Sequence, residues 1–142
     1  MRKAEFLTTL NASCVYPLAY GGRGIWHINA PLVYYSAILD RIIIVEVGFY
    51  TDFASTPRCP GIYWLFGDTG KYESVIHDWL YHHHEICDEQ TANLVLFEAA
   101  RAIGTPKWTR VGMYLGVAFG GESSWKEDGK GFGHTVVNGR VV

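Results

Sequence analysis

The chain has 142 residues, 49% of them apolar and 15% aromatic, which is enough for one domain with a substantial buried core. Its net charge of −2 argues against a nucleic-acid binder that relies on a broad basic surface. No apolar run approaches the ~20 residues that a membrane-spanning helix needs. Polar residues follow the basic N-terminus, so we predict no signal peptide.

The first part of the chain, up to about residue 55, has the composition of β-strands. Residues 32–35 and 41–47 are rich in β-branched and aromatic side chains, which favour a pleated, buried surface. The glycines of residues 21–24 indicate a turn. We therefore expect a small, mostly antiparallel sheet, whose short apolar runs are covered on both faces or packed under a helix.

Beyond Pro60 the apolar residues take up the period of helices. Apolar side chains recur at steps of three and four residues over 71–87, which predicts one helix there. A second helix is predicted over residues 89–103. Asp88 is its expected N-cap, and Gly104 is expected to close it in the left-handed conformation.

A third helix is expected to begin at Thr105-Pro106, because proline is favoured in the first helical turn. Gly112, Gly116 and Gly120 lie four residues apart on this helix. Their spacing predicts a smooth face on which another helix packs closely.

The segment 121–142 is rich in glycine and charged residues, and we expect a mobile or partner-bound tail. Within it Asn138-Gly139 lies between Val136-Val137 and Val141-Val142, and this pattern predicts a small hairpin. The complete pattern predicts an α+β fold with a single domain over residues 1–120. In this domain the N-terminal sheet packs against a C-terminal bundle of about three helices.

One stripe of polar side chains on the helix predicted over 71–87 consists of His77, Tyr81 and His84, at positions i, i+4 and i+7. His77 with a carboxylate partner is a candidate general base, because imidazole titrates near neutral pH. Tyr81 is then a structural residue whose hydroxyl is bonded to a carboxylate. The alternative role for His77 and Asp78 together is a buried polar contact that ties the helix to the loop 51–58.

A second stripe on the same helix consists of Asp78, His82 and Glu85. Asp78 is a hard oxygen ligand for Ca²⁺ or Mg²⁺, or a partner of a backbone amide. Together the three residues are of the types that hold zinc or another transition metal. The alternative for the run 82–84 is a set of solvated, partly packed histidines, since adjacent helical residues point about 100° apart and cannot all bind one ion.

The strand-rich part ends in the sequence GFYTDFASTPR at 48–58. Pro57 fixes its own φ and pushes Thr56 toward an extended conformation, so any strand ends here. Asp52 and Ser55 bond nearby backbone amides in many turns, which makes a rigid corner one interpretation.

In the functional interpretation of this corner, Asp52 lies against His77 or at a metal, and Thr51 and Ser55 face a ligand. Arg58 is a candidate for bidentate binding of a carboxylate or phosphate, with a surface salt bridge as the alternative.

These motifs resemble the DUF1353 family, small proteins encoded by tailed phages, prophages and some bacteria. The resemblance covers about residues 15–120 and is carried by the strand at 43–47, GFYTDFASTPR at 48–58, HDWLY at 77–81, and Asp88. The family has no established activity. Membership implies a phage or prophage origin. The aromatic richness and the tail favour partner contacts, so we expect other phage structural proteins as partners and a location in the virion or the host cytoplasm.

A looser resemblance links HDWLY to the catalytic helix pair of phospholipase A2. Carried over, it implies that His77 activates water and that Asp78 holds Ca²⁺. Asp88 from the next helix would then orient the imidazole with help from Tyr81.

Two functions stay open. The first is a structural or assembly component of a phage particle, tail-associated and oligomeric within it, in which the polar motif holds the fold together. The second is a metal-assisted or His-based hydrolase that attacks an ester or amide of the cell envelope during entry, with Ca²⁺ or Zn²⁺ as its cofactor. Convergence of His77, Asp78 and Asp52 on an open pocket would favour the hydrolase, and their burial with mutual bonding would favour the structural role.

Overall fold

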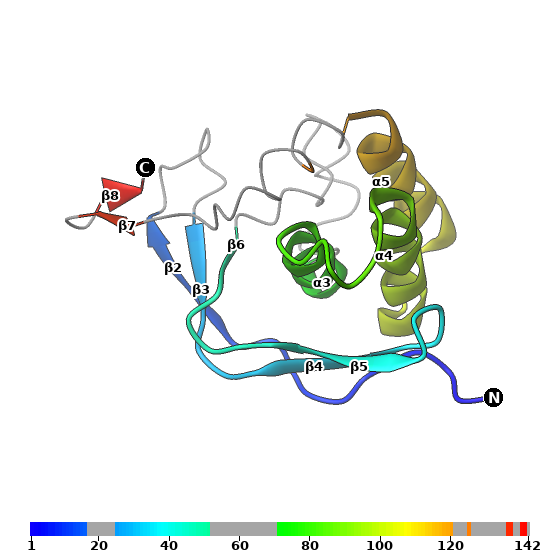
Figure 1. Cartoon of the computed structure of the whole chain (residues 1–142), viewed down its shortest axis with the longest axis horizontal. Coiled ribbons are helices and arrows are strands. Elements are labelled where there is room, and N and C mark those ends of the chain that lie inside the picture. Colours follow the sequence, from blue (N-terminus) through cyan, green and yellow to red (C-terminus); the bar gives the residue numbers. More distant parts are fainter. Residues whose placement is uncertain (17–24, 52–70, 121–124, 126–135, 138–139, 142) are drawn as a thin grey trace.

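A computed structural model of the whole chain describes residues 1–16, 25–51, 71–120, 125, 136–137 and 140–141. Strands occupy the N-terminal part and helices follow them, so the fold is α+β as the sequence predicts (Figure 1). None of the helices in these ranges has the length and hydropathy of a membrane span.

The strands form two small antiparallel sheets, with the orders β1-β4-β5 and β2-β3-β6. A separate hairpin pairs β7 with β8 across positions 138–139, which confirms the predicted hairpin. The strands are β1 (Glu5–Phe6), β2 (Ala12–Tyr16), β3 (Ile25–Ile28), β4 (Leu32–Ser36), β5 (Arg41–Val45), β6 (Tyr50–Thr51), β7 (Val136–Val137) and β8 (Arg140–Val141).

Three helices follow: α3 (Lys71–Tyr81), α4 (Glu89–Ile103) and α5 (Lys107–Gly120). The bounds and caps of α4 are the predicted ones. Asp88 caps its start by accepting a hydrogen bond from the backbone N–H of Thr91 at 2.8 Å, and Gly104 closes it with φ of 88°.

The helix predicted over 71–87 is shorter than expected, since α3 ends at Tyr81. The ring Nδ1 of His83 lies 2.6 Å from the carbonyl oxygen of Trp79, the acceptor that the backbone N–H of His83 would need to continue the helix. That N–H bonds to the carbonyl of Leu80 instead, at 3.1 Å. The tighter i to i−3 bond ends the helix, and residues 82–87 form turns.

The helices α3 and α4 cover one face of the β1-β4-β5 sheet (Figure 1), and the core lies between these layers. The strands contribute Ile28, Leu32, Tyr34, Ile43 and Val45, α3 contributes Val75, Ile76, Trp79 and Leu80, and α4 contributes Ala92, Val95 and Ala99. A second, smaller cluster of Leu96, Met113 and Val117 attaches α5 to α4.

Glu98 of α4 ties this helix to the sheet. Its Oε1 accepts hydrogen bonds from the Tyr34 hydroxyl at 2.7 Å and the Ser36 hydroxyl at 2.8 Å, and its Oε2 accepts one from the backbone N–H of Ile38 at 2.8 Å. The sequence analysis did not single out this residue. It fixes how α4 lies across β4 and the turn that follows.

Of the two alternatives expected for the apolar strand runs, β5 follows the second, since it lies at the edge of its sheet and packs under a helix. Ile43 and Val45 are buried under the helices, whereas Ile42 and Ile44 are 44% and 54% exposed. The described helices cover one face of the sheet, so alternate residues of β5 face away from the core.

The expected close packing on the glycines of α5 is also not found. Within the described residues, no atom of a neighbouring element lies within 4 Å of a Cβ built at Gly112 or Gly116. The helix contacts α4 through Met113 and Val117 instead. Both glycines therefore lie on the exposed side of α5.

Candidate functional site

His77 lies in the middle of α3 and points toward α4. Its Nε2 is 2.8 Å from the side-chain oxygen of Asn93, and the hydroxyl of Tyr81 donates to the same oxygen at 2.8 Å. The rings of His77 and Tyr81 are 4.2 Å apart. Because the amide oxygen can only accept, Nε2 carries the proton and Nδ1 carries the lone pair.

The imidazole of His77 is neutral at physiological pH. Only 4% of the residue is exposed. Burial lowers the pKa of His77 to about 4, against a smaller opposing effect of the hydrogen bond to Asn93. A group with this pKa is a hydrogen-bonding residue at neutral pH and a weak base, since general bases work best with a pKa near the operating pH.

The partner of His77 is a residue that the sequence analysis missed. Within the described residues an amide meets Nε2, whereas the expected carboxylate partner Asp52 lies outside them. Asn93 sits on the buried side of α4, next to Ala92 and close to Val95 and Leu96. A polar amide in that apolar stripe needs a buried partner, and this is the signal that could have identified it.

Tyr81 lies beside His77 on the same face of α3, and its hydroxyl donates to the amide oxygen of Asn93. A bond from this hydroxyl to a carboxylate stays a prediction. Asp88 serves as the exposed N-cap of α4. Its hydrogen bonds with Thr91 hold its pKa below the usual value. In the described residues, the acceptor that orients the imidazole of His77 is therefore Asn93 and not Asp88.

The second stripe is only partly brought together. Asp78 and His82 lie one turn apart, with Oδ1 and Nε2 separated by 3.8 Å, and both side chains are largely buried. Glu85 is exposed in the turn beyond the helix. The described part of the chain contains no group of three or more His, Cys, Asp or Glu residues that could hold a metal ion. Asp78, His82 and Glu85 thus form no such group, and a Ca²⁺ or Zn²⁺ site stays a prediction.

The corner that ends the strand-rich part is described only at its start. Thr51 is buried in β6, where it pairs with Trp26 of β3. Asp52, Ser55 and Arg58 lie outside the described residues. The expected meeting of Asp52 with His77 therefore stays a prediction.

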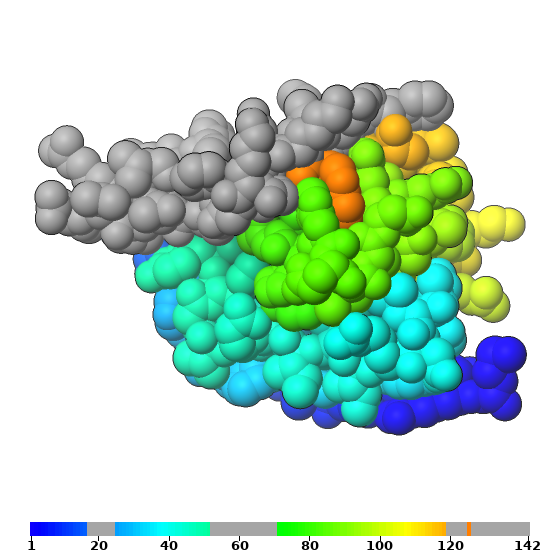
Figure 2. All heavy atoms as spheres, in the orientation of Figure 1, coloured from blue at the N-terminus to red at the C-terminus, as the bar shows by residue number. Residues whose placement is uncertain are grey.

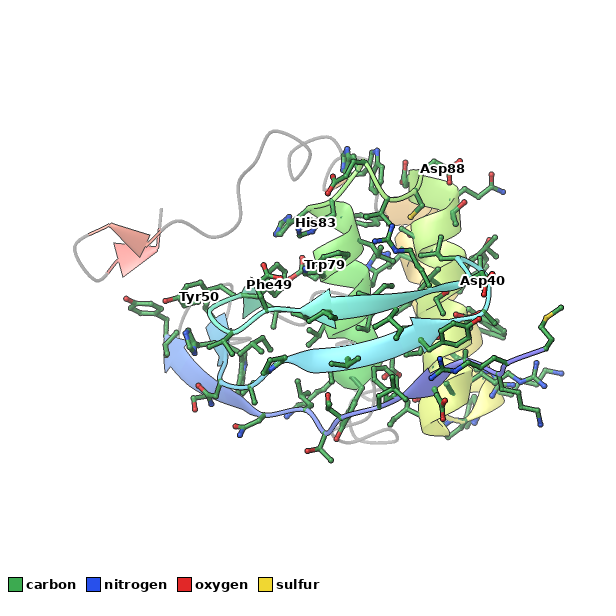
Figure 3. The ribbon with its side chains drawn as sticks, turned by 60° about the horizontal axis from the view of Figure 1, so that its bottom comes forward. Asp40, Phe49, Tyr50, Trp79, His83 and Asp88 are labelled. Carbon is green, nitrogen blue, oxygen red and sulfur yellow. The ribbon has the colours of Figure 1, made fainter. Side chains whose placement is uncertain are left out.

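The other histidines of the run pack against tryptophans. His83 stacks on Trp79 with ring centroids 3.8 Å apart, and Figure 3 shows both residues at the end of α3. His84 stacks on Trp125 at 3.5 Å. Trp125 also meets the ring of Tyr81 edge-on at 5.1 Å. One residue of the predicted tail thus packs directly beside the His77 network.

Trp79 has a second contact that connects α3 to the sheet. Its indole N–H donates to the carboxylate of Glu46 at 2.9 Å. Among the described residues, the polar side chains around the end of α3 contact one another and neighbouring aromatic rings. This arrangement joins α3 to α4, to the sheet and to Trp125.

A comparison with curated proteins found no match, and a comparison with solved structures found none either. A family model does match, over residues 26–117, which include the strand, the start of the corner and HDWLY described above. The description of that family is "Protein of unknown function (DUF1353)", and the chain belongs to it.

Proposed function

We propose that the chain is a structural or assembly component of a phage particle, associated with the tail, in which the polar motif on α3 holds the fold together. The phage setting follows from the origin that membership of this family implies. The structural role of the motif rests on the state of His77.

The burial of His77 carries this proposal. The side chain is enclosed between α3 and α4 and bonded to Asn93, which also accepts the Tyr81 hydroxyl. Its pKa of about 4 leaves it neutral and weakly basic. A buried, mutually bonded group of this kind supports a role in architecture more than one in proton transfer.

The test uses particles of the phage or prophage that encodes the chain. We expect quantitative mass spectrometry of purified particles to find the chain in a fixed ratio to a tail protein. Particles made without it should be incomplete or non-infective. Absence of the chain from intact particles would overturn the proposal.

His77→Gln separates architecture from chemistry in the same system. The glutamine amide keeps an N–H near the position of Nε2 and keeps the bond to Asn93, but it removes the basic Nδ1. A structural role predicts that this variant is incorporated and restores infectivity. Normal incorporation without infectivity would favour a chemical role.

The second candidate is a His-based hydrolase, and one observation favours it. The oxygen of Asn93 fixes the tautomer of His77, so that Nδ1 is always the proton acceptor. The test is hydrolysis of phospholipid, ester and peptide substrates by the purified chain, with and without added Ca²⁺ or Zn²⁺. Turnover that disappears in folded His77→Gln would establish this function.

A further inference from the structure

The strand β5 lies at the edge of its sheet. In the order β1-β4-β5 it pairs only with β4, and no described strand lies along its other side. Figure 3 shows β5 as the outermost of the three strands, and Figure 2 shows the cyan residues of this region at the molecular surface. Its outward-facing side chains, Ile42 and Ile44, are 44% and 54% exposed.

The hydrogen bonds of β4 show which backbone groups of β5 face this open edge. The carbonyl of Val33 accepts from the N–H of Leu7, and the N–H of Val33 donates to the hydroxyl of Thr8, so both groups of Val33 point toward the β1 side. Val33 is opposite Ile44. Because hydrogen-bonded and non-hydrogen-bonded pairs alternate in antiparallel sheets, Ile44 is not bonded to β4.

The same alternation applies one pair further along the ladder. Ile42 lies opposite Tyr35, two positions from the Val33–Ile44 pair, and it is likewise not bonded to β4. The backbone N–H and C=O groups of Ile42 and Ile44 therefore point to the open edge. Each of these residues presents a donor and an acceptor in the plane of the sheet.

From this geometry we propose that two copies of the chain pair through their β5 edges, antiparallel, around a two-fold axis at Ile43. Ile42 then lies opposite Ile44 of the partner subunit, and Ile44 opposite Ile42 of the partner subunit. Each of these pairs exchanges two backbone hydrogen bonds. The three-stranded sheets of the two copies join into one continuous sheet.

The pattern of the edge specifies a second copy as the occupant. A one-residue shift would place the outward-facing Ile42 opposite an inward-facing Ile43, so only shifts of two residues keep the helical layers of both copies on one face of the joined sheet. After a shift of two residues, only one of the residues Ile42 and Ile44 would lie opposite Ile42 or Ile44 of the partner subunit. In the register centred on Ile43, both Ile42 and Ile44 have such a partner. A two-fold axis at Ile43 makes these two pairs equivalent.

The charges at the ends of β5 agree with this orientation. Arg41 stands at one end of the strand and Glu46 follows the other end. In the proposed register Glu46 lies opposite Asp40 of the partner subunit, with the partner's Arg41 next to it, so each end of the paired strands carries charges of both signs. Parallel pairing would instead place Arg41 beside Arg41 and Glu46 beside Glu46. The nearby Asp40 is held by its bond to the hydroxyl of Tyr35.

The strand also lacks the devices that usually protect an edge. Residues 41–45 read RIIIV, with no proline and no lysine, and their pairing with β4 runs without a bulge. The predicted interface is small, so we expect a concentration-dependent equilibrium between monomer and dimer rather than a permanent dimer. This inference does not depend on the function proposed above.

Sedimentation velocity on the full chain tests the proposal. We expect the mass to rise from the 16.0 kDa of the monomer toward twice that value as concentration increases to about 1 mM, where weak complexes are populated. Ile44→Lys should raise the dissociation constant at least about tenfold, because lysine on an edge strand opposes pairing. Leu115→Lys replaces a residue of similar exposure on α5, at 46%, and should dimerise like the wild-type chain.

Disulfide trapping tests the register directly. In the proposed pairing the Cα atoms of Ile42 and the partner's Ile44 are about 5.5 Å apart, within disulfide range, whereas like residues are separated by roughly 7–8 Å. A mixture of Ile42→Cys and Ile44→Cys should therefore cross-link on oxidation faster than either variant alone. The wild-type chain, which contains free Cys14 and Cys87, gives the background.

A wild-type mass that stays at 16.0 kDa over the whole concentration range would overturn the proposal. So would an Ile44→Lys variant that is folded by circular dichroism and dimerises as well as wild type. Equal cross-linking in the mixed and the separate samples would overturn the register.

Discussion

The side-chain oxygen of Asn93 lies 2.8 Å from Nε2 of His77 and accepts the hydroxyl of Tyr81 at the same distance. One amide oxygen on α4 thus satisfies two buried donors on α3. Removing this acceptor would take away a hydrogen-bond partner of a buried N–H and of a buried O–H, and a buried group left unsatisfied costs about 1–3 kcal/mol. This contact makes the motif HDWLY part of the packing between the two helices.

Asn93→Leu should destabilise the fold. The substitution keeps the volume but removes the acceptor, so we expect the free energy of unfolding to fall by about 3 kcal/mol. Tyr81→Phe removes one donor and leaves the contact with His77 intact, so it should cost only about 1 kcal/mol. Urea unfolding monitored by circular dichroism measures both. Equal stability of Asn93→Leu and wild type would contradict the role assigned to the amide.

Stability should fall in acid because of His77. The pKa of His77 is about 4 in the folded chain and 6.5 in the unfolded chain, so the unfolded state binds the proton more readily between these values. The stabilisation is complete above pH 6.5 and is lost as the pH falls toward 4, by about 3 kcal/mol in total.

The matched control is His77→Gln, which cannot titrate. Its unfolding free energy should lack this acid-side loss, so the difference between variant and wild type should change with pH between 7 and 4. Urea melts at intervals across that range provide the measurement. A difference that is constant with pH would show that His77 does not titrate with a lowered pKa.

Much of this architecture could be predicted from local patterns. The bounds and both caps of α4 follow from Asp88, Gly104 and the spacing of apolar residues, because capping depends on nearby atoms. The antiparallel hairpin of β4 and β5 likewise follows from two β-branched runs separated by a short turn. In these elements the residues that decide the structure are close together in the sequence.

The errors have a common physical origin in contacts that local patterns do not contain. The end of α3 depends on where the side chain of His83 bonds, and the period of apolar residues carries no information about it. Asn93 is 16 positions from His77, and Glu98 is 64 from Tyr34. A single sequence does not indicate which distant polar residues meet, although a polar residue on an apolar helix face is a useful sign.

Glu73 should make stability fall as pH rises. It is completely buried on α3, one oxygen accepts the hydroxyl of Thr105 at 2.7 Å, and the other has no hydrogen-bond partner within the described residues. Burial raises the pKa of Glu73 above 4.5, so its contribution is fully present below pH 4.5 and is lost as the pH rises through the folded-state pKa.

Glu73→Gln tests this directly, because glutamine stays neutral and can still accept from Thr105. We expect the variant to be more stable than wild type at pH 8 and equally stable at pH 4. Thermal melts at the two pH values measure the difference. A variant that is less stable than wild type at pH 8 would indicate that the carboxylate is charged and paired in the folded chain.

Glu98→Ala should weaken the attachment of α4 to the sheet. The carboxylate accepts from the hydroxyls of Tyr34 and Ser36 and from the N–H of Ile38, and all three donors lose their acceptor in the variant. We expect a loss of about 3 kcal/mol in the free energy of unfolding. Burial and, after it, the bond to Glu98 raise the pKa of Tyr34, so the pKa of this phenol should be lower in the variant than in the wild-type chain. Glu89→Ala, in the first turn of the same helix, is the control and should cost less than about 1 kcal/mol. Urea unfolding measures the free energy of unfolding, and ultraviolet titration measures the pKa of tyrosine. Only the Glu98 variant should change both quantities, which distinguishes the loss of this contact from a general effect of removing a carboxylate from α4.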